Sequence, residues 1–366
     1  MLKYFETRTR IIVLAAAGAT IATLLLRLGG APGVATFAAS AVGLAGLALL
    51  VGQGTEQLAH RLGPRATGVL QSALGNLPEF FIGIFALRAG LLDVVRAALV
   101  GSILANTLLV LGLAFLVGGL RHGPQRFGTD QTKLMATLLL LAAAAIAIPT
   151  IAASPGGPAY GHATELSVVV SLVLLVVFAA SVPFAVGKGS GIGSLDGTDR
   201  TDRTDRTEPA WPLPLAAATL LVAGVGAAFV SDWFVDALKP AMDSLGMSES
   251  FAGLVVVAIA GNAVENVVGV QAMLADRGDL AISVILNSSL QVALGLVPVL
   301  VLLSLVIGGP TLTLVVSPLL VAALALTAVL SALVVIDGES TWLEGLALIG
   351  LYVILAASVW WGQPVA

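Results

Sequence analysis

Long apolar runs, separated by short polar segments, repeat along nearly the whole chain. About 20 apolar residues in a helix span roughly 30 Å of hydrocarbon, so each run is long enough to cross a bilayer. The runs lack the period-two alternation of a membrane β-strand, and a helix satisfies its own backbone hydrogen bonds in lipid. The pattern therefore predicts an all-α integral membrane protein of about eleven transmembrane helices. They are expected at residues 11–27, 33–53, 66–88, 93–118, 134–153, 164–187, 212–238, 250–275, 279–306, 312–335 and 341–361.

The composition agrees with a membrane protein. Of the 366 residues, 58% are hydrophobic and only 10% are charged, whereas about a quarter of the residues in soluble domains are charged. The net charge of -4 is small, and the sequence has no basic stripe of the kind that binds nucleic acid. The absence of cysteine excludes disulfides and thiolate metal sites. A metal site would have to use oxygen or imidazole ligands.

The first apolar run allows two interpretations. Residues 11–26 follow Lys3, Arg8 and Arg10 and precede a stretch of small residues, an arrangement that a signal peptide also has. The next apolar run begins almost at once, which favours a helical hairpin in the membrane. We therefore expect residues 1–30 to form an extra N-terminal transmembrane helix.

The basic residues predict the orientation. With a cytoplasmic N-terminus, the outside segments hold only Arg27, Arg88, Arg96 and Lys239 of the 17 Lys and Arg residues. This bias agrees with the positive-inside rule, and the opposite orientation would reverse it. The odd number of helices then places the C-terminus outside. We expect a multi-pass protein of a prokaryotic plasma membrane.

A polar stretch at residues 188–210 contains GKGSGIGS followed by TDRTDRTDRTEP. A segment so rich in Gly, Asp, Thr and Arg cannot bury a core, which predicts a flexible cytoplasmic linker. An alternative role is a weak cation sensor, although the interleaved arginines offset most of the acidic charge. The linker separates residues 31–187 from residues 211–366.

Two segments on either side of this linker resemble each other. GNLPE at 75–79 and GNAVE at 261–265 share three positions, and the same sequence separation relates Asp93 to Asp279 and Ser102 to Ser288. A register held over two consecutive helices indicates an internal repeat. The copies lie five helices apart, an odd number, so their helices run in opposite directions. Residues 31–187 and 211–366 are therefore expected to be inverted five-helix repeats, an arrangement typical of secondary transporters.

Glu79 and Glu265 are flanked by apolar sequence on both sides. A carboxylate at such depth costs at least about 2–3 kcal/mol, so it must be protonated, paired or bound to a cation. No Lys or Arg lies in the same stretch of either helix. Two such carboxyls can hold protons or a divalent cation but not both at once, as a cation/proton exchanger requires.

Neutral oxygen atoms accompany the two glutamates. Calcium takes about six to eight oxygen ligands, and the candidates fall on or near one helix face. They are Asn76, Asn262, Ser102, Asn106, Ser288, Ser289 and Gln291. Gly75 and Gly261, each four residues before its glutamate, and Pro78 would loosen the helix and free carbonyls as ion ligands. The alternative is that glycines and small polar residues only pack helices together.

Five segments carry a resemblance to a known family: GTEQLAHRLGPRATGVLQSALGNLPEFFIGIFAL, DVVRAALVGSILANTLLVLG, GNAVENVVGV, DLAISVILNSSLQVAL and DGESTWLEG. In these segments, from about Gly52 to Trp361, the chain resembles the calcium/proton exchangers of the calcium/cation antiporter superfamily. The resemblance implies an extra N-terminal helix, two five-helix halves and alternating access to a central site. It places the essential acidic residues of the family on Glu79 and Glu265. Its supporting polar residues fall on Asn76, Ser102, Asn106, Asn262, Ser288 and Gln291.

Four positions depart from the pattern of that family. Leu77 and Pro78 replace small or β-branched residues, Asn287 replaces a glycine, and Asn266 replaces the histidine that usually follows the second glutamate. The charge-balanced TDR repeat also replaces an acidic segment between the halves. These departures bear on ion choice, coupling and regulation, and not on the fold.

The leading interpretation is a secondary antiporter, and not an enzyme, that exchanges Ca²⁺ for H⁺ by alternating access. Its expected partners are the cation, protons and the lipid bilayer, with no cofactor and no nucleic acid, and an oligomer is compatible with the sequence. The same fold could instead exchange Na⁺, K⁺ or Mn²⁺. The inverted repeat argues against a cation channel, and the lack of a nucleophile or histidine near either glutamate argues against an intramembrane hydrolase.

Overall fold

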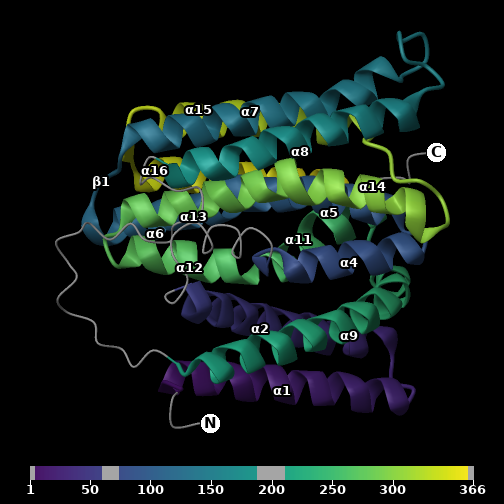
Figure 1. The fold of residues 1–366 in the computed structure, drawn as a ribbon, viewed down its shortest axis with the longest axis vertical. Coiled ribbons are helices and arrows are strands. Elements are labelled where there is room, and N and C mark those ends of the chain that lie inside the picture. Colours follow the sequence, from purple (N-terminus) through teal and green to yellow (C-terminus); the bar gives the residue numbers. More distant parts are fainter. Residues whose placement is uncertain (1–4, 60–73, 188–210, 362–366) are drawn as a thin grey trace. The chain divides into compact units, whose positions relative to one another are not determined.

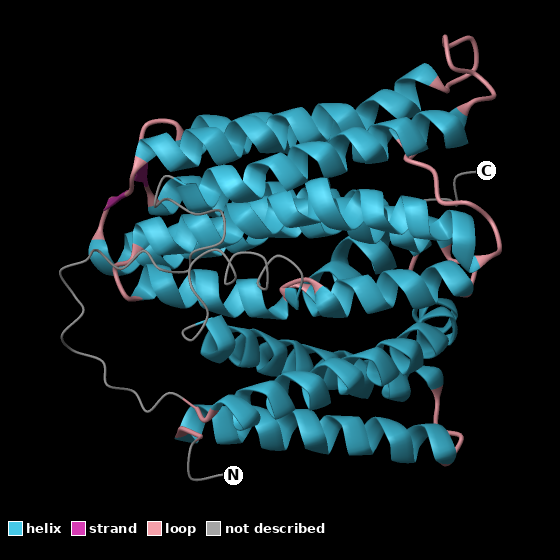
Figure 2. Ribbon diagram, in the orientation of Figure 1, coloured by secondary structure: helices cyan, strands magenta, loops and turns pink. Residues whose placement is uncertain are grey.

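The computed structural model describes residues 5–59, 74–187 and 211–361. These residues form helices joined by short loops, with one small two-stranded sheet (Figure 2). The expected all-α class is confirmed. The chain divides into two compact units: unit 1 is residues 1–85, 182–245 and 260–264, and unit 2 is residues 86–181, 246–259 and 265–366. The expected linker at 188–210 lies outside the described residues.

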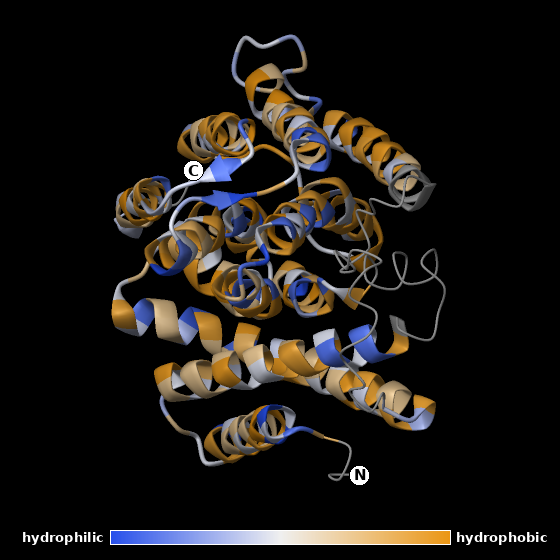
Figure 3. Ribbon diagram, turned by 90° about the vertical axis from the view of Figure 1, so that its left-hand side faces the viewer, coloured by the Kyte–Doolittle hydropathy of each residue, from blue (hydrophilic) through white to orange (hydrophobic). Residues whose placement is uncertain are grey.

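The described helices are those of a multi-pass membrane protein. Nine of them are long and apolar enough to cross a membrane, and the bent pair 249–261 and 263–274 makes ten. Hydrophobic residues run along the helices, whereas hydrophilic residues gather on the strands (Figure 3). On α8 (Ala163–Gly187), Leu172 and Val176 are exposed, and lipid would cover such apolar surface. The remaining expected span, 66–88, lies partly outside the described residues, which include its second half as α4 (Leu77–Arg88).

Unit 1 is built on three helices that lie side by side (Figure 1). They are α1 (Thr7–Leu28), α2 (Gly33–Ala59) and α9 (Leu213–Leu245). The close approach of α1 and α2 depends on Gly46, where an added Cβ would lie 2.8 Å from the Cβ of Ala16. Small residues permit such contact between membrane helices. An ion pair of 2.6 Å between Arg27 and Asp236 joins α1 to α9.

The other helices after α4 lie wholly or partly in unit 2. In chain order they are α5 (Leu92–Leu104), η2 (Ala105–Val110), α6 (Leu111–His122), α7 (Thr129–Ala152), α8, α10 (Glu249–Phe251), η3 (Ala252–Val257), α11 (Ala258–Gly261), α12 (Ala263–Leu274), α13 (Gly278–Gln291), η4 (Val292–Leu296), α14 (Val297–Ile307), α15 (Pro318–Val335) and α16 (Trp342–Trp360). Of these, α8, α11 and α12 cross the boundary between the units along the chain. Strands β1 (Gln125–Arg126) and β2 (Glu339–Ser340) pair antiparallel, with Gln125 opposite Ser340.

Three stretches, η2, η3 and η4, are π-helical. Such a wider turn is rare and often marks a functional site. η2 continues α5 and η4 continues α13, so each follows a helix that carries candidate site residues. The two turns also occupy equivalent positions relative to the two glutamates in the sequence. The similarity between the two sequence segments is therefore accompanied by the same local distortion of the helix.

The expected span 312–335 begins too early. α15 starts at Pro318, and residues 308–317 form a non-helical segment, which we call the strap. The side chain of Ser317 caps α15 by accepting a hydrogen bond from the amide of Leu320. Pro318 suits the first helical position because no intrahelical partner exists there for an amide hydrogen. The apolar residues of the strap extend the hydrophobic run of the sequence, which is why hydropathy alone placed them in the helix.

Glu344 caps a helix at the other end of the sequence. Thr341 is the N-cap of α16, and its side chain accepts a hydrogen bond from the amide of Glu344. The Glu344 carboxylate in turn accepts one from the amide of Thr341, at 2.7 Å. This capping box satisfies amide groups that the start of a helix leaves free. Glu344 therefore has a structural explanation separate from ion binding.

The packing of α5 against η3 generates a stability prediction. At Gly101 an added Cβ would lie 2.5 Å from the backbone of Leu254, whereas at Gly350 of α16 nothing lies within 4 Å. Overpacking costs about 1–3 kcal/mol, so Gly101→Ala should lower the melting temperature in detergent by about 3 °C or more. Gly350→Ala, the matched control, should leave it unchanged or raise it. Equal melting temperatures for the two variants would contradict the close approach at Gly101.

Candidate cation site

Both candidate glutamates stand just after a break in a helix. Helical structure is interrupted at Gly75 and Asn76, and Glu79 lies in the first turn of α4. It is interrupted again at Asn262, where segments 249–261 and 263–274 meet at 63°, and Glu265 lies in the first turn of α12. A break in the helix is therefore present beside each glutamate, as the sequence predicted, whereas the role of the glycines and Pro78 in freeing carbonyl ligands stays a prediction. The positive end of a helix dipole favours a carboxylate in this position.

The two carboxyl groups are buried. Glu79 is 7% exposed and Glu265 is 8% exposed. The candidate site residues divide between the units: Glu79, Asn76, Gly75, Asn262 and Gly261 belong to unit 1, and Glu265, Ser102, Asn106, Ser288 and Gln291 belong to unit 2. Each unit therefore holds one glutamate with several neutral oxygen atoms.

In unit 1 the sequence motifs of the two halves meet at Glu79. Asn262 donates a hydrogen bond from its Nδ2 to Oε1 of Glu79. Gly261 packs so closely that an added Cβ would overlap the Cγ of Glu79. Asn76 is buried beside the same helix break. The GNxxE motif of one half thus contacts the glutamate of the other half, although 183 residues separate Asn262 from Glu79.

In unit 2 Asn106 and Ser288 are the polar side chains placed near Glu265. The amide Nδ2 of Asn106 donates to Oγ of Ser288 at 3.0 Å, and the Ser288 side chain lies close to the Glu265 carboxyl. Ser102 and Gln291 are buried on the same two helices, at 3% and 5% exposure. Four of the expected polar residues therefore lie on α5, η2 and α13 in this unit.

The oxygen atoms in these groups suit a hard cation. Carboxylate, amide and hydroxyl oxygens are the ligands that Ca²⁺ prefers. Within residues 5–59, 74–187 and 211–361, no three His, Cys, Asp or Glu side chains cluster as a metal site.

Two departures noted in the sequence are also placed by the structure. Asn287 lies on α13 next to Ser288 and is 8% exposed, and no described group bonds to its buried Oδ1. Asn266 follows Glu265 on α12, and its Nδ2 lies 3.5 Å from the carbonyl oxygen of Ile259. Among the residues that sequence reasoning did not select, Arg96 makes two hydrogen bonds to Thr313, far outside its own helix. The only signal in the sequence was that Arg96 is one of the four basic residues that the expected orientation leaves outside.

Helices broken beside buried glutamates, with neutral oxygen atoms around them, are features of membrane proteins that transport cations. The comparison with known families agrees. The chain belongs to the sodium/calcium exchanger protein family, whose model matches residues 32–187 and 215–361.

Individual relatives are similar over most of their length. The chain is 35% identical over 330 residues to a Ca²⁺/H⁺ antiporter of Synechocystis sp., with 86% of this chain and 88% of that protein covered. It is 33% identical over 331 residues to the Ca²⁺/H⁺ antiporter ChaA of Bacillus subtilis, with 89% and 92% covered. The structure of native YfkE matches with a TM-score of 0.81 at 28% identity, over 95% and 99% of the chains. The H⁺/Ca²⁺ exchanger CAX, at 17% identity and a TM-score of 0.75 over 96% and 92%, shows likeness of fold.

The contact between Gly261 and Glu79 can be tested directly. Gly261→Ala should displace the Glu79 side chain and reduce cation uptake by membrane vesicles about tenfold or more, because the added Cβ would overlap Cγ. Gly224→Ala in the same unit is the control, since its Cβ would meet Leu77 at an ordinary 3.4 Å. If Gly261→Ala transports as well as Gly224→Ala, the packing around Glu79 does not matter for function.

Proposed function

We propose that this protein is a secondary antiporter that exchanges Ca²⁺ for H⁺ across a membrane by alternating access. The observation that carries this proposal is the pair of buried glutamates, each at a helix break and each with a neutral polar side chain close to its carboxyl group. The named activities of the two bacterial relatives support the choice of ions. The transported Ca²⁺ and H⁺ are substrates, and the proposal includes no cofactor and no enzymatic reaction.

The chemistry of exchange follows from the carboxyl groups. Each glutamate is neutral when it carries a proton and negative when it does not, and only the negative form attracts a cation. Two negative charges equal the charge of a divalent cation, so protons and Ca²⁺ are alternative ways of neutralising the same groups. Asn262 donates a hydrogen bond to Glu79, which stabilises its charged form and orients its oxygen atoms, and Ser288 lies close enough to Glu265 to act in the same way. The remaining candidate ligands are Asn76, Ser102, Asn106, Gln291 and the backbone at Gly75 and Gly261.

The proposed architecture is an extra N-terminal helix, residues 1–30, followed by inverted repeats at 31–187 and 211–366 that a cytoplasmic linker at 188–210 joins. The equivalent positions of η2 and η4 support the repeat. The distribution of basic residues favours a cytoplasmic N-terminus and an external C-terminus in a prokaryotic plasma membrane. With this orientation, exchange in the favoured direction removes Ca²⁺ from the cytoplasm while protons enter.

A second candidate is exchange of Mn²⁺, Na⁺ or K⁺ by the same fold. Asn287 and Asn266 each add an amide oxygen beside a candidate site residue, and amide oxygens ligate hard cations such as Mn²⁺ as well as Ca²⁺. Uptake into everted vesicles under an imposed pH gradient, measured in parallel for the four cations, distinguishes the candidates. A preference for another cation over Ca²⁺ would overturn the assigned substrate but not the antiport.

Replacing either glutamate should abolish exchange. Glu79→Gln and Glu265→Gln keep the size and hydrogen-bonding capacity of the side chain but remove the charge that must alternate between proton and cation. We expect Ca²⁺ uptake driven by a pH gradient to fall at least about 100-fold in each variant, with insertion into the membrane unchanged.

Glu344→Gln is the matched control for this experiment, because Glu344 caps α16. It should transport at close to the unmodified rate. Near-normal uptake by either Glu79→Gln or Glu265→Gln would show that exchange does not require both carboxyls.

A further inference from the structure

The strap, residues 308–317, is a stretch of non-helical backbone within a unit of membrane helices. Its side chains alternate along the chain, with Leu312, Leu314 and Val316 buried. In the hydrocarbon region such backbone is tolerated only where the protein itself satisfies the amide and carbonyl groups. The strap meets this requirement through side chains from four helices.

Three hydroxyl groups accept hydrogen bonds from the strap. The amides of Leu312, Leu314 and Val316 donate to them at 2.9, 2.9 and 3.0 Å. The hydroxyls come from three different helices: Ser304 from α14, Ser167 from α8 and Thr150 from α7. Thr150 also donates its hydrogen to the carbonyl oxygen of Leu314, at 3.2 Å.

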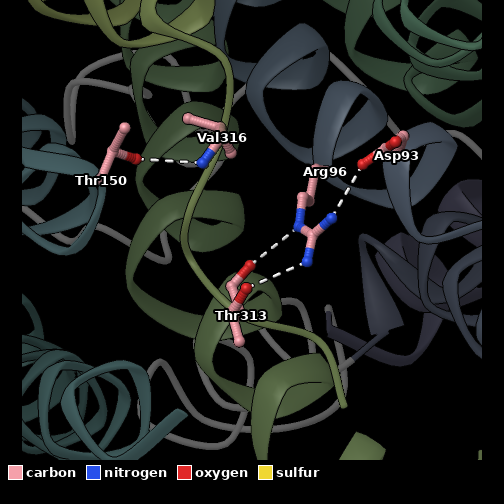
Figure 4. Close-up of polar contacts among 5 residues, drawn as sticks. All are labelled: Asp93, Arg96, Thr150, Thr313 and Val316. Atoms are coloured by element: carbon pink, nitrogen blue, oxygen red, sulfur yellow. Dashed lines mark hydrogen bonds and ion pairs between the residues drawn. The ribbon is translucent and has the colours of Figure 1, made fainter. Parts of the chain in front are cut away.

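Arg96 ties the strap to a fourth helix, α5 (Figure 4). Its Nε donates to the carbonyl oxygen of Thr313 at 3.1 Å, and its Nη2 donates to the Thr313 hydroxyl at 3.0 Å. Its Nη1 donates to Oδ1 of Asp93 at 2.8 Å, and this ion pair holds the guanidinium in place. The Arg96 side chain is only 19% exposed, a setting in which charge-assisted hydrogen bonds are strong. Asp93, Arg96 and Thr313 together are called the first clasp.

A second clasp involves Asp279, the residue that the repeat relates to Asp93. Its Oδ1 accepts a hydrogen bond of 2.6 Å from the amide of Gly128, in the loop between α6 and α7. Both aspartates lie in the first turn of a helix, α5 or α13. Asp279 bonds to its loop directly, whereas Asp93 acts through Arg96. In both cases the loop is the connection between the third and fourth helices of the other proposed repeat. The two clasps are therefore counterparts under the proposed symmetry.

The clasps lie at opposite ends of unit 2, and both are closed. In Figure 1 the loop after α14 is at one end of the helices and β1, beside Gly128, is at the other end. In an inverted-repeat transporter, alternating access is largely a rocking or gating of one repeat against the other around a fixed site. Gates at the two ends of the site would open in turn. Both clasps are closed in this structure, which is the arrangement expected of fasteners that take no part in gating.

We propose that the first clasp is a permanent fastener, which ties α5 to the strap in both access states. Arg96 is then a positioning residue. Ser102 follows it on α5, and Asn106 stands in η2, directly beyond α5, where it donates to Ser288. A fixed end of α5 keeps these ligands in register while the protein alternates. This inference rests on the proposed exchange function.

The chain contains no cysteine, so a covalent link can replace the first clasp without a background reaction. In the double variant Arg96→Cys/Thr313→Cys, the clasp is cut, and the apparent KM for Ca²⁺ in everted vesicles should rise about tenfold. A short bifunctional methanethiosulfonate should then bridge the two cysteines in place of the arginine side chain. The KM should return to near its original value, and a reductant should reverse the rescue. Arg96→Cys alone with the same reagent is the control and should stay impaired.

Two outcomes would overturn the proposal. Inhibition by the completed link, relieved by reductant, would show that the clasp must open during transport. An unchanged KM in the unlinked double variant would show that the clasp does not position the ligands. If the unmodified protein does not exchange Ca²⁺ for H⁺, the proposed function fails instead, and the two failures are distinct.

A milder variant keeps the proposal testable if the double variant does not reach the membrane. Arg96→Lys retains the charge for Asp93 but loses the planar fork that contacts Thr313 at two points. It should raise the KM for Ca²⁺ about threefold and leave the maximal rate nearly unchanged. An unaltered KM would contradict a positioning role for Arg96.

Discussion

A polar group in hydrocarbon has no water to bond with, so the protein must supply its partner. The described part of the chain depends on this constraint throughout. It explains why nearly all of the backbone is helical, because a helix satisfies its own amides and carbonyls. It also explains why the strap, which is not helical, is surrounded by hydroxyl groups of Ser304, Ser167 and Thr150. Each of these side chains has one oxygen that can accept while its hydrogen bonds elsewhere.

The same constraint makes the two glutamates informative. A buried carboxyl needs donors, a proton or a cation. The structure provides a neutral donor for Glu79 in Asn262 and places the neutral side chain of Ser288 close to Glu265. Neutral donors leave the charge of the carboxylate available, whereas a fixed Lys or Arg partner would cancel it. Arg96 illustrates the contrast, because its pairing with Asp93 produces a structural tie. A carboxyl with a neutral donor, such as Glu79, keeps a charge that a proton or a cation can neutralise. A carboxyl paired with a fixed arginine, such as Asp93, has a structural role.

Hydropathy alone predicted most helices to within a few residues, because the requirement that it measures is the one that the bilayer imposes. α1, α8 and α16 follow their expected spans closely. The same measure misplaced the start of α15, since an extended apolar strap and an apolar helix have the same average hydropathy. The helix breaks near Glu79 and Glu265 could be predicted, because glycine, proline and asparagine signal them locally. The bond from Asn106 to Ser288 and the contacts of Arg96 with Thr313 could not, because they join residues 182 and 217 positions apart.

The strap has a consequence for biogenesis. Its partners Arg96, Thr150 and Ser167 precede it by 217, 166 and 147 residues, respectively, so they leave the ribosome and enter the membrane long before it is synthesised. Before the strap is made, the Ser167 hydroxyl is not left without a hydrogen-bond partner, because it donates to the carbonyl oxygen of Ala163 on its own helix at 2.6 Å. Arg96 likewise has a partner on its own helix, because it forms an ion pair with Asp93, three residues before it. The early helices can therefore be inserted as stable intermediates, and the strap completes their polar contacts late in translation, when the C-terminal helices arrive.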